Sequence, residues 1–360
     1  MATTITNEKE HLKALSILTL CSEHASAALE HVALLDRQAR AEFLELADSH
    51  HVVVRSLRSL AAAAAPDRTE LQPWITAALA AEQARIQNAL EFLDRICREL
   101  ERAGCPVTVM KSLDHWPDIG NDLDLYSSAD GQTIRDIFVR NLGAYVEPRS
   151  WGDQLAQKWN FALPGLRENV EVHSQRLGQT GEHVALARRF ITRRMEQKIG
   201  SYTFMVPAPE ERIIVATLQR MYRHFYFRLC DIANSAALVE SGELDFDELH
   251  RAADVGGIWP GVATYLLIVS DYVNQYRGQP VPLPESVRKA ARFGGEKLYV
   301  LRRFLRVPLL PEGAELYTKQ VASTALRGDV LATFRLSLLP PLAAAASVAF
   351  KITGNDKGIW

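Results

Sequence analysis

Strand-like patterning in this chain of 360 residues is concentrated in one central stretch, and that concentration limits the folds open to it. Residues 122–126 alternate aspartates with apolar side chains, and residues 169–173 alternate polar and apolar side chains, as half-buried strands do. Shorter strand-like runs lie at residues 107–110, 144–146 and 159–163, and one further strand is expected later, at residues 202–206. Apolar residues on either side recur at helical spacing. The sequence therefore predicts an α+β fold, with a small sheet between N-terminal and C-terminal helical regions.

This patterning divides the chain into three expected parts. Residues 1–84 form an N-terminal helical region, residues 85–178 form an α/β core, and residues 179–360 form a mostly helical C-terminal domain. A long helix is expected to run from about residue 74 to residue 102 into the core. Gly104 can cap that helix, and Pro106 prevents its continuation. A second helix is expected over residues 129–141, with Ser128 as its cap.

Composition excludes several classes of protein. Hydrophobic residues make up 48% of the chain, which is ordinary for a globular protein. Lys and Arg number 41 against 43 Asp and Glu, so no global basic excess favours a long nucleic acid, although a local patch is not excluded. The four cysteines lack metal-finger spacing and suit a reducing cytosol, which predicts a cytoplasmic location. The apolar run at residues 343–350 is too short to span a membrane and is expected to form a buried helix, and no signal peptide is expected.

The residues with the clearest chemical meaning are Asp122 and Asp124. At positions i and i+2 of a strand, their carboxylates share one face, while the leucines between and after them face the other way. Two like charges this close favour a neutralising cation, and Mg²⁺ binds one or two carboxylates together with substrate phosphates. The Lys111-Ser112 turn, which comes before residues 113–121, is placed to hold such phosphates. This arrangement suggests nucleotidyl transfer.

A third carboxylate, Glu171, lies on the later alternating strand. Antiparallel pairing of that strand with the Asp122–Asp124 strand would bring Glu171 beside the two aspartates. His173 shares the face of Glu171, because residues i and i+2 of a strand point the same way.

The spacing resembles the polymerase-β-type nucleotidyltransferase signature: a small turn, a gap of about nine to thirteen residues, a Dh[D/E]h strand, and a later acidic strand residue. More closely, the chain resembles the bacterial uncharacterised nucleotidyltransferase family. The matching motifs are Met110-Lys111-Ser112, Asp122-Leu123-Asp124-Leu125, Glu171-Val172-His173, the 223–232 stretch RHFYFRLCDI, and the 244–249 stretch LDFDEL. The resemblance covers most of residues 80–275 and implies a polymerase-β-type core with a mixed sheet.

The resemblance also implies an activity and a set of site residues. The expected enzyme is an NTP-dependent and metal-dependent transferase that moves NMP onto an acceptor and releases pyrophosphate, with Mg²⁺ or alternatively Mn²⁺. The residues expected to be catalytic and to bind metal are Asp122, Asp124 and Glu171. The residues expected to bind nucleotide are Lys111, Ser112, His173, Arg228 and Asp231.

This chain departs from the family pattern in three places. Ser112 replaces the usual glycine after the lysine, and its Cβ restricts the backbone. Residues 118–121 contain no arginine, although the family often has one shortly before its first aspartate. Glu171 replaces the usual aspartate as the third acid, with a longer side chain.

Simpler interpretations of these residues stay open. Lys111 could be a surface lysine, His173 a hydrogen-bonded structural histidine, and Arg228 and Asp231 a structural ion pair. With His224, these last two residues are expected on one helical face. The basic cluster at Arg188, Arg189, Arg193 and Arg194 is expected to be a solvated helix face, with caution also for Arg302, Arg303 and Arg306. Trp151 and Trp159 are expected to be core residues rather than a base-stacking platform.

The acceptor favoured by the charge balance is a small molecule or a peptide, and a nucleic acid is not favoured. One alternative is a toxin-like transferase that modifies tRNA or protein, for which a basic groove beside Asp122 would be evidence. Another is a catalytically degenerate binding or scaffold protein, motivated by Ser112 and the missing arginine. No P-loop or kinase catalytic loop supports a kinase.

Overall fold

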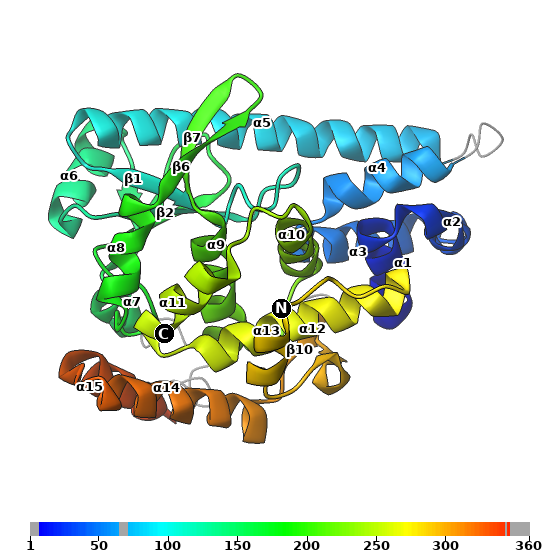
Figure 1. Ribbon diagram of the computed structural model, residues 1–360. Helices are drawn as coiled ribbons and strands as arrows, with labels where there is room; N and C mark the ends of the chain where they lie inside the picture. The colour runs from blue at the N-terminus through cyan, green and yellow to red at the C-terminus, as the bar shows by residue number, and fades with distance from the viewer. Residues whose placement is uncertain (1–6, 65–70, 343, 346–360) are drawn as a thin grey trace.

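The centre of the molecule is a five-stranded mixed sheet in the order β1-β2-β5-β4-β3 (Figure 1). The computed structural model describes residues 7–64, 71–342 and 344–345. The five strands are β1 (Val107–Met110), β2 (Asp122–Ser127), β3 (Tyr145–Val146), β4 (Lys158–Ala162) and β5 (Asn169–Ser174). β2 and β5 pair in parallel, and the other neighbours pair antiparallel. The predicted strands and the mixed α+β class are confirmed.

One long helix, α5 (Gln72–Arg102), lies along the sheet and crosses the upper part of Figure 1. It carries a stripe of buried residues from Ile86 to Leu100 that packs in one hydrophobic cluster with β1, β2 and α6 (Gly131–Asn141). The helix ends as the sequence predicts. Gly104 has a φ of 74°, Gly104 N donates to Glu101 O, and Cys105 N donates to Leu100 O, which is the Schellman arrangement.

The helix after β2 begins two residues later than expected. Ser128 is the predicted cap of this helix, but the structure places Asp130 there, with its carboxylate accepting from Gln132 N and Thr133 N. That prediction was wrong because aspartate caps a helix as well as serine does, and Ser128 lies outside the first turn. The remaining helix within the core, α7 (Trp151–Leu155), begins with a capping box at Ser150 and Asp153.

A two-stranded hairpin stands beside the sheet. It consists of β6 (Arg194–Ile199) and β7 (Tyr202–Pro207), and β7 contacts β1 and α5 (Figure 1). The β7 strand was predicted, but its partner was missed because Arg194 was included in a basic helix. The helix there, α8, ends at Thr192.

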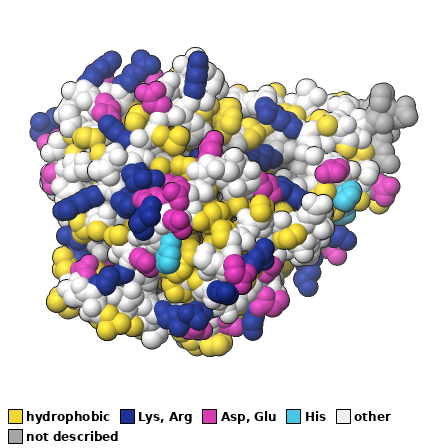
Figure 2. Space-filling view, in the orientation of Figure 1, with side chains coloured by type: hydrophobic (Ala, Val, Ile, Leu, Met, Phe, Trp, Pro, Cys, Tyr) yellow, Lys and Arg dark blue, Asp and Glu magenta, His cyan; other side chains and the backbone are white. Residues whose placement is uncertain are grey.

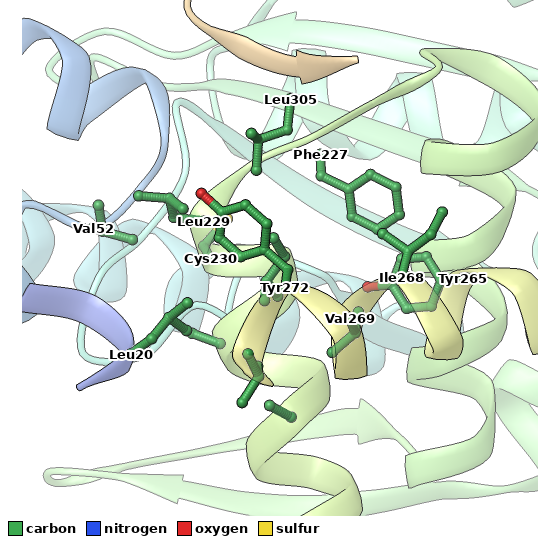
Figure 3. Packing of buried hydrophobic residues seen from close by; sticks show 14 of the residues in the cluster. Leu20, Val52, Phe227, Leu229, Cys230, Tyr265, Ile268, Val269, Tyr272 and Leu305 are labelled. Carbon is green, nitrogen blue, oxygen red and sulfur yellow. The ribbon is translucent and has the colours of Figure 1, made fainter. Parts of the chain in front are cut away.

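The N-terminal and C-terminal helices share one continuous hydrophobic core. One cluster contains Leu20 and Val52, Tyr265 and Tyr272 from α12 (Trp259–Arg277), and Leu305, and Figure 3 shows Tyr265 next to Phe227. The N-terminal helices are α1 (Glu8–Leu20), α2 (Ala25–Ala33), α3 (Arg37–Ser49) and α4 (Val53–Ala63). The later helices are α8 (Val184–Thr192), α9 (Pro209–Thr217), α10 (Leu229–Glu240), α11 (Phe246–Gly256), α12 (Trp259–Arg277), α13 (Glu285–Ala290), α14 (Ala314–Leu326) and α15 (Val330–Ser337). The three-part division of the chain stays a prediction.

A small sheet within the C-terminal part was not predicted. It has the order β8-β10-β9, from β8 (Tyr226–Phe227), β9 (Tyr299–Leu301) and β10 (Phe304–Arg306). Two or three residues per strand are too few to show a period of two, so these segments carry no recognisable strand pattern.

No helix among the described residues is long and apolar enough to cross a membrane. The buried helix predicted at residues 343–350 lies almost wholly outside the described residues.

Candidate active site

The turn after β1 places a lysine in an unusual backbone conformation. Lys111 has a φ of 54°, in the left-handed region that favours glycine, while Ser112 does not have a positive φ. The residue that replaces the family glycine therefore does not carry the strained conformation. Lys111 carries it instead, and such a position in a non-glycine residue is often associated with function.

Ser112 links this turn to the strand that carries the aspartates. Its Oγ accepts a hydrogen bond from Asp124 N at 2.8 Å and lies 3.3 Å from Asp122 O. A glycine at this position would make neither contact. Ser112 thus fixes the turn against the backbone of both aspartates.

The loop between the turn and β2 is held by arginines from other elements. The side chain of Arg55 donates to His115 O and Trp116 O, and that of Arg85 donates to Ile119 O. Asp118, in the segment where an arginine was expected, accepts from the backbone N of Val54 and of Arg55 at the start of α4. Residues 118–121 therefore anchor the loop to the N-terminal helices.

The sheet places Asp124 directly beside Glu171. These two residues are register partners in the parallel pair β2–β5, and His173 follows on the same face of β5. Antiparallel pairing was expected, and this prediction was wrong. The strand antiparallel to β5 is β4, so β5 fits between β4 and β2 and runs in the direction of β2.

Asp124, Glu171 and His173 form a compact group of potential ligands. One ligand atom from each lies within 4.8 Å of the others. Asp122 points to the same face two residues earlier, is the most exposed of the four, and is not part of this group. The three acids Asp122, Asp124 and Glu171 together are called the carboxylate cluster.

Two lysines neutralise much of this negative charge. Lys111 Nζ lies 2.5 Å from Asp124 Oδ1. Lys158 Nζ lies 2.9 Å from both Glu171 Oε2 and Asp153 Oδ1. Both lysines are more than nine-tenths buried. Lys158 was missed as a site residue, because its role depends on β4 lying next to β5, and the predicted strand began one residue after it.

The acids of the cluster differ in their ionisation. Burial raises the pKa of Asp124 to about 6, with Lys111 opposing and the charge of Glu171 adding to the effect. Burial and the charge of Glu171 also raise the pKa of Asp122. Burial would raise the pKa of Glu171 as well, but Lys158 and His173 hold it well below its usual range. Glu171 is therefore the acid that stays ionised, while Asp122 and Asp124 gain most from an added cation.

The donor set fits a divalent cation. Carboxylate oxygens are the ligands of Mg²⁺, and an imidazole nitrogen is also accepted by Mn²⁺. His173 Nε2 lies 2.7 Å from Glu171 Oε1, burial lowers the His173 pKa, and its Nδ1 is buried without a partner among the described residues. His173 therefore orients Glu171 in this arrangement. This agrees with the simpler interpretation of His173 as a hydrogen-bonded structural histidine.

Arg228 and Asp231 do not share a helical face with His224. Strand β8 separates His224 from Arg228, and Arg228 is the N-cap residue of α10, so the prediction of one continuous helix was wrong. The Asp231 carboxylate accepts from Arg228 N at 2.7 Å and pairs with Arg220 Nε at 2.7 Å. Asp231 therefore forms a structural ion pair with Arg220, and not with Arg228 as the simpler interpretation had it.

The Arg228 guanidinium has a different environment. It lies over the rings of Tyr226 and Phe304, at 5.8 and 6.0 Å from their centroids, and its Nε is buried without a hydrogen-bond partner among the described residues. Its positive charge opposes the rise that burial causes in the pKa of Asp122. Arg228 thus lies near the carboxylate cluster with hydrogen-bonding capacity left over.

A cavity of about 1050 Å³ lies next to the partners of the carboxylate cluster, although none of the three acids is among its lining residues. Lys111, Lys158 and His173 line one end of it. Arg223 and His224, at the end of a π-helical turn (Leu218–Arg223) that continues α9, line it further out. Arg223 was missed as a site residue, although it lies in the matching 223–232 stretch.

The other predicted features are structural. In the basic cluster, Arg189 pairs with Glu211 and Glu248, and Arg193 pairs with Glu210. The remaining two residues lie on different elements, Arg188 in α8 and Arg194 in β6.

The two tryptophans also differ from each other. Trp159 is buried and stacks on Phe161, as expected of a core residue. Trp151 is 61% exposed, so its expected place in the core was wrong.

A family model described as "Uncharacterised nucleotidyltransferase" matches residues 37–274. The chain belongs to this family. The matched segment contains the Lys111-Ser112 turn, the carboxylate cluster and Arg228, and it ends before β9. Comparisons with curated proteins and with solved structures each found no match.

Proposed function

We propose that this protein is a Mg²⁺-dependent nucleotidyltransferase with a polymerase-β-type core, which transfers NMP from an NTP to a small acceptor and releases pyrophosphate. The observation that carries the proposal is the convergence of Asp124, Glu171 and His173 within 4.8 Å, beside Asp122 and two lysines. Membership of the nucleotidyltransferase family supports the same chemistry.

Each residue has a defined role in this proposal. Asp122, Asp124 and Glu171 would hold the metal, with Mn²⁺ as an alternative to Mg²⁺. A bound divalent cation supplies positive charge to the phosphate oxygens of the donor nucleotide. Lys111 and Lys158 line the cavity where the triphosphate would lie, and Ser112, buried behind them, would contribute to nucleotide binding by holding the turn that carries Lys111. Lys111 and Lys158 would exchange carboxylate contacts for phosphate contacts.

The transfer itself needs one proton acceptor. An acceptor oxygen attacks the α-phosphorus, the bond to the pyrophosphate oxygen breaks, and the acceptor proton leaves. Asp124, whose pKa burial raises to about 6, is the stronger base and would take that proton, while Glu171, which Lys158 and His173 keep ionised, would orient the acceptor hydroxyl. Arg228 would contact the nucleotide, and Asp231 would position Arg228 through its backbone N.

The surroundings of the site support a small acceptor, either a small molecule or a peptide. Figure 2 shows basic and acidic side chains interspersed over one face, without a continuous basic patch. The cavity beside the cluster has mostly apolar walls, which favours a compact organic ligand over a nucleic acid. A cytoplasmic location, expected from the cysteine spacing, agrees with the four free thiols of the chain.

The test is calorimetric titration with ATP, GTP, CTP and UTP in the presence of Mg²⁺. The wild type is expected to bind one or more of them, and the Asp122→Asn/Asp124→Asn variant is expected to lose that binding. Asp136→Asn is the matched control, because Asp136 is a partly exposed acid on α6 that pairs with Arg140. A wild type that binds no nucleotide, or an Asp122→Asn/Asp124→Asn variant that binds as the wild type does, would refute the proposal in favour of the scaffold alternative.

A further inference from the structure

The cavity beside the carboxylate cluster has two walls with different origins. One wall comes from the family-matched segment, with Lys111, Lys158 and Arg223. The other lining residues lie beyond position 274, chiefly in the β9–β10 hairpin and at the start of α14. The volume of about 1050 Å³ is at the upper end of the range for a single small-molecule pocket, so it has room for a second ligand beside a nucleotide.

Three arginines on these walls have no acidic partner. Arg223, Arg302 and Arg306 have no carboxylate within 4.0 Å in the part of the chain that the structure describes. The two acids on the walls are already engaged. Asp153 pairs with Lys158, and Glu182 accepts hydrogen bonds from Thr180. Thr180 does not remove the charge of Glu182, but the three arginines outnumber this one acid, so the cavity has a net positive charge, which favours an anion.

The arginines are held in place without acids. The Arg306 guanidinium lies 5.0 Å from the centroid of the Tyr226 ring, and its Nε is 3.4 Å from Leu301 O. A cation held over an aromatic ring keeps its other N–H groups available to a ligand. Arg223 lies close enough to Lys158 for its charge to oppose the protonation of that lysine, so it connects the arginines to the carboxylate cluster.

The hairpin turn is strained in a way that presents Arg302. Arg302 and Arg303 both have positive φ, 49° and 74°, in a two-residue turn where Asn and Gly are favoured. The two arginines have different surroundings. Arg303 is tied to the N-terminal helices, with its N donating to Glu8 Oε1 and its side chain to Glu45. Arg302 lines the cavity.

The rest of this end of the cavity is apolar. Leu301, Leu310 and Tyr317 are among its lining residues, from β9, the segment before α14, and α14 itself. A ligand that satisfies both features has an apolar body and one anionic group.

We propose that the end of the cavity walled by the β9–β10 hairpin is the acceptor subsite, and that it takes a small amphipathic anion whose carboxylate or phosphate contacts Arg302 and Arg306. This inference rests on the proposed function, because the anion is an acceptor only if the protein is a transferase. The triphosphate is assigned to the opposite end, where the two lysines and the carboxylate cluster lie.

The test uses two fluorescent probes that differ in one charged group. 8-Anilinonaphthalene-1-sulfonate has an apolar body with a sulfonate, and N-phenyl-1-naphthylamine has the same body without it. The full chain is expected to bind the sulfonate at least about tenfold more tightly, because hydrogen bonds to charged groups contribute that much or more. In Arg302→Gln/Arg306→Gln, the affinity for the sulfonate should fall about tenfold, while the affinity for the neutral probe changes less than about twofold.

Two further variants locate the binding. Arg58→Gln/Arg188→Gln removes two exposed arginines that do not line the cavity, and both probes should bind it as they bind the wild type. Ala314→Trp fills the cavity from α14, and both probes should bind it more weakly. Unfolding by heat, followed by circular dichroism, establishes that each variant is folded.

The outcomes separate this inference from the proposed function. Equal loss of sulfonate binding in the two arginine pairs, or no effect of Ala314→Trp, would overturn the subsite. Weaker Mg²⁺–NTP binding by Arg302→Gln/Arg306→Gln, with sulfonate binding intact, would also overturn it and reassign these arginines to the triphosphate. The expected probe pattern in a wild type that binds no NTP would support an anion site while refuting the transferase.

Discussion

Lys158 is a buried cation that pairs with two carboxylates. Its replacement by methionine should lower the free energy of unfolding by an amount that follows from the burial of the three groups. Its side chain is 9% exposed, and those of Asp153 and Glu171 are 13% and 15% exposed. Methionine keeps the length and loses the charge, which leaves two largely buried acids without their cation. Removing one partner of a buried ion pair costs about 3–5 kcal/mol, and the residual exposure favours the lower figure of about 3 kcal/mol. With an m-value of about 3 kcal/mol/M, the urea midpoint should fall by about 1 M.

The same variant should respond more strongly to Mg²⁺ than the wild type does. Without Lys158, a divalent cation at the carboxylate cluster no longer competes with a tethered ammonium group. Free Mg²⁺ at 100 times its Kd would restore about 2.7 kcal/mol. The assay is urea unfolding followed by circular dichroism, with and without Mg²⁺.

The matched control is Lys289→Met. Lys289 is 76% exposed and pairs with Glu285, itself 69% exposed, so its midpoint should not move. If Lys158→Met unfolds at the wild-type midpoint without Mg²⁺, Lys158 does not neutralise these acids and the reasoning is wrong. If Mg²⁺ raises both midpoints equally, the lysine does not compete with the metal.

Three further predictions follow from single residues. Burial lowers the pKa of His50 to about 4 in the folded protein, where its Nε2 is hydrogen-bonded to Arg303 O. In the unfolded chain the same histidine is protonated below about pH 6.5, so acid favours unfolding. The free energy of unfolding should therefore be highest above about pH 6.5 and fall by up to about 3 kcal/mol as the pH drops to 4. Urea titrations should show a smaller fall in His50→Gln. Ser112→Ala should cost about 1–2 kcal/mol in the same assay, since Asp124 N loses its acceptor, and an unchanged midpoint would contradict the bridging role. Lys111→Gly should be more stable than Lys111→Ala by about 1 kcal/mol, because only the glycine relieves the positive φ; the reverse order would show that no strain is present.

The sequence predicted those parts of the fold in which periodicity is strong. The alternation at residues 169–173 and 122–126 located β5 and β2, and the apolar stripe with Gly104 located α5 and its end. Each of these patterns lies within one element, because a helix or strand with one buried face repeats its apolar residues with its own period. The short strands of the β8–β10 sheet lack such a pattern because their neighbours, rather than their own period, define them.

The site was predicted as a set of residues but not as an arrangement. Asp124, Glu171 and His173 converge as expected, although through parallel pairing. The direction of pairing depends on how the intervening chain returns, which includes α6, α7, β3 and β4. Lys158 and Arg302 were not assigned to the site for the same reason, since only the tertiary fold brings their elements to the cluster and the cavity.

The contact between the N-terminal helices and the β9–β10 hairpin has a consequence for how the protein folds during synthesis. Arg303 N bonds to Glu8, 295 residues earlier, and Leu305 packs in the core that contains Leu20 and Val52 (Figure 3). At about 5–20 residues per second, a ribosome that has made the N-terminal helices needs roughly 12–48 s more to reach this hairpin. During that interval, those apolar residues of α1 and α4 that pack against the later elements stay exposed. The family-matched segment alone would share this exposure permanently, because the residues that complete its core lie beyond position 274.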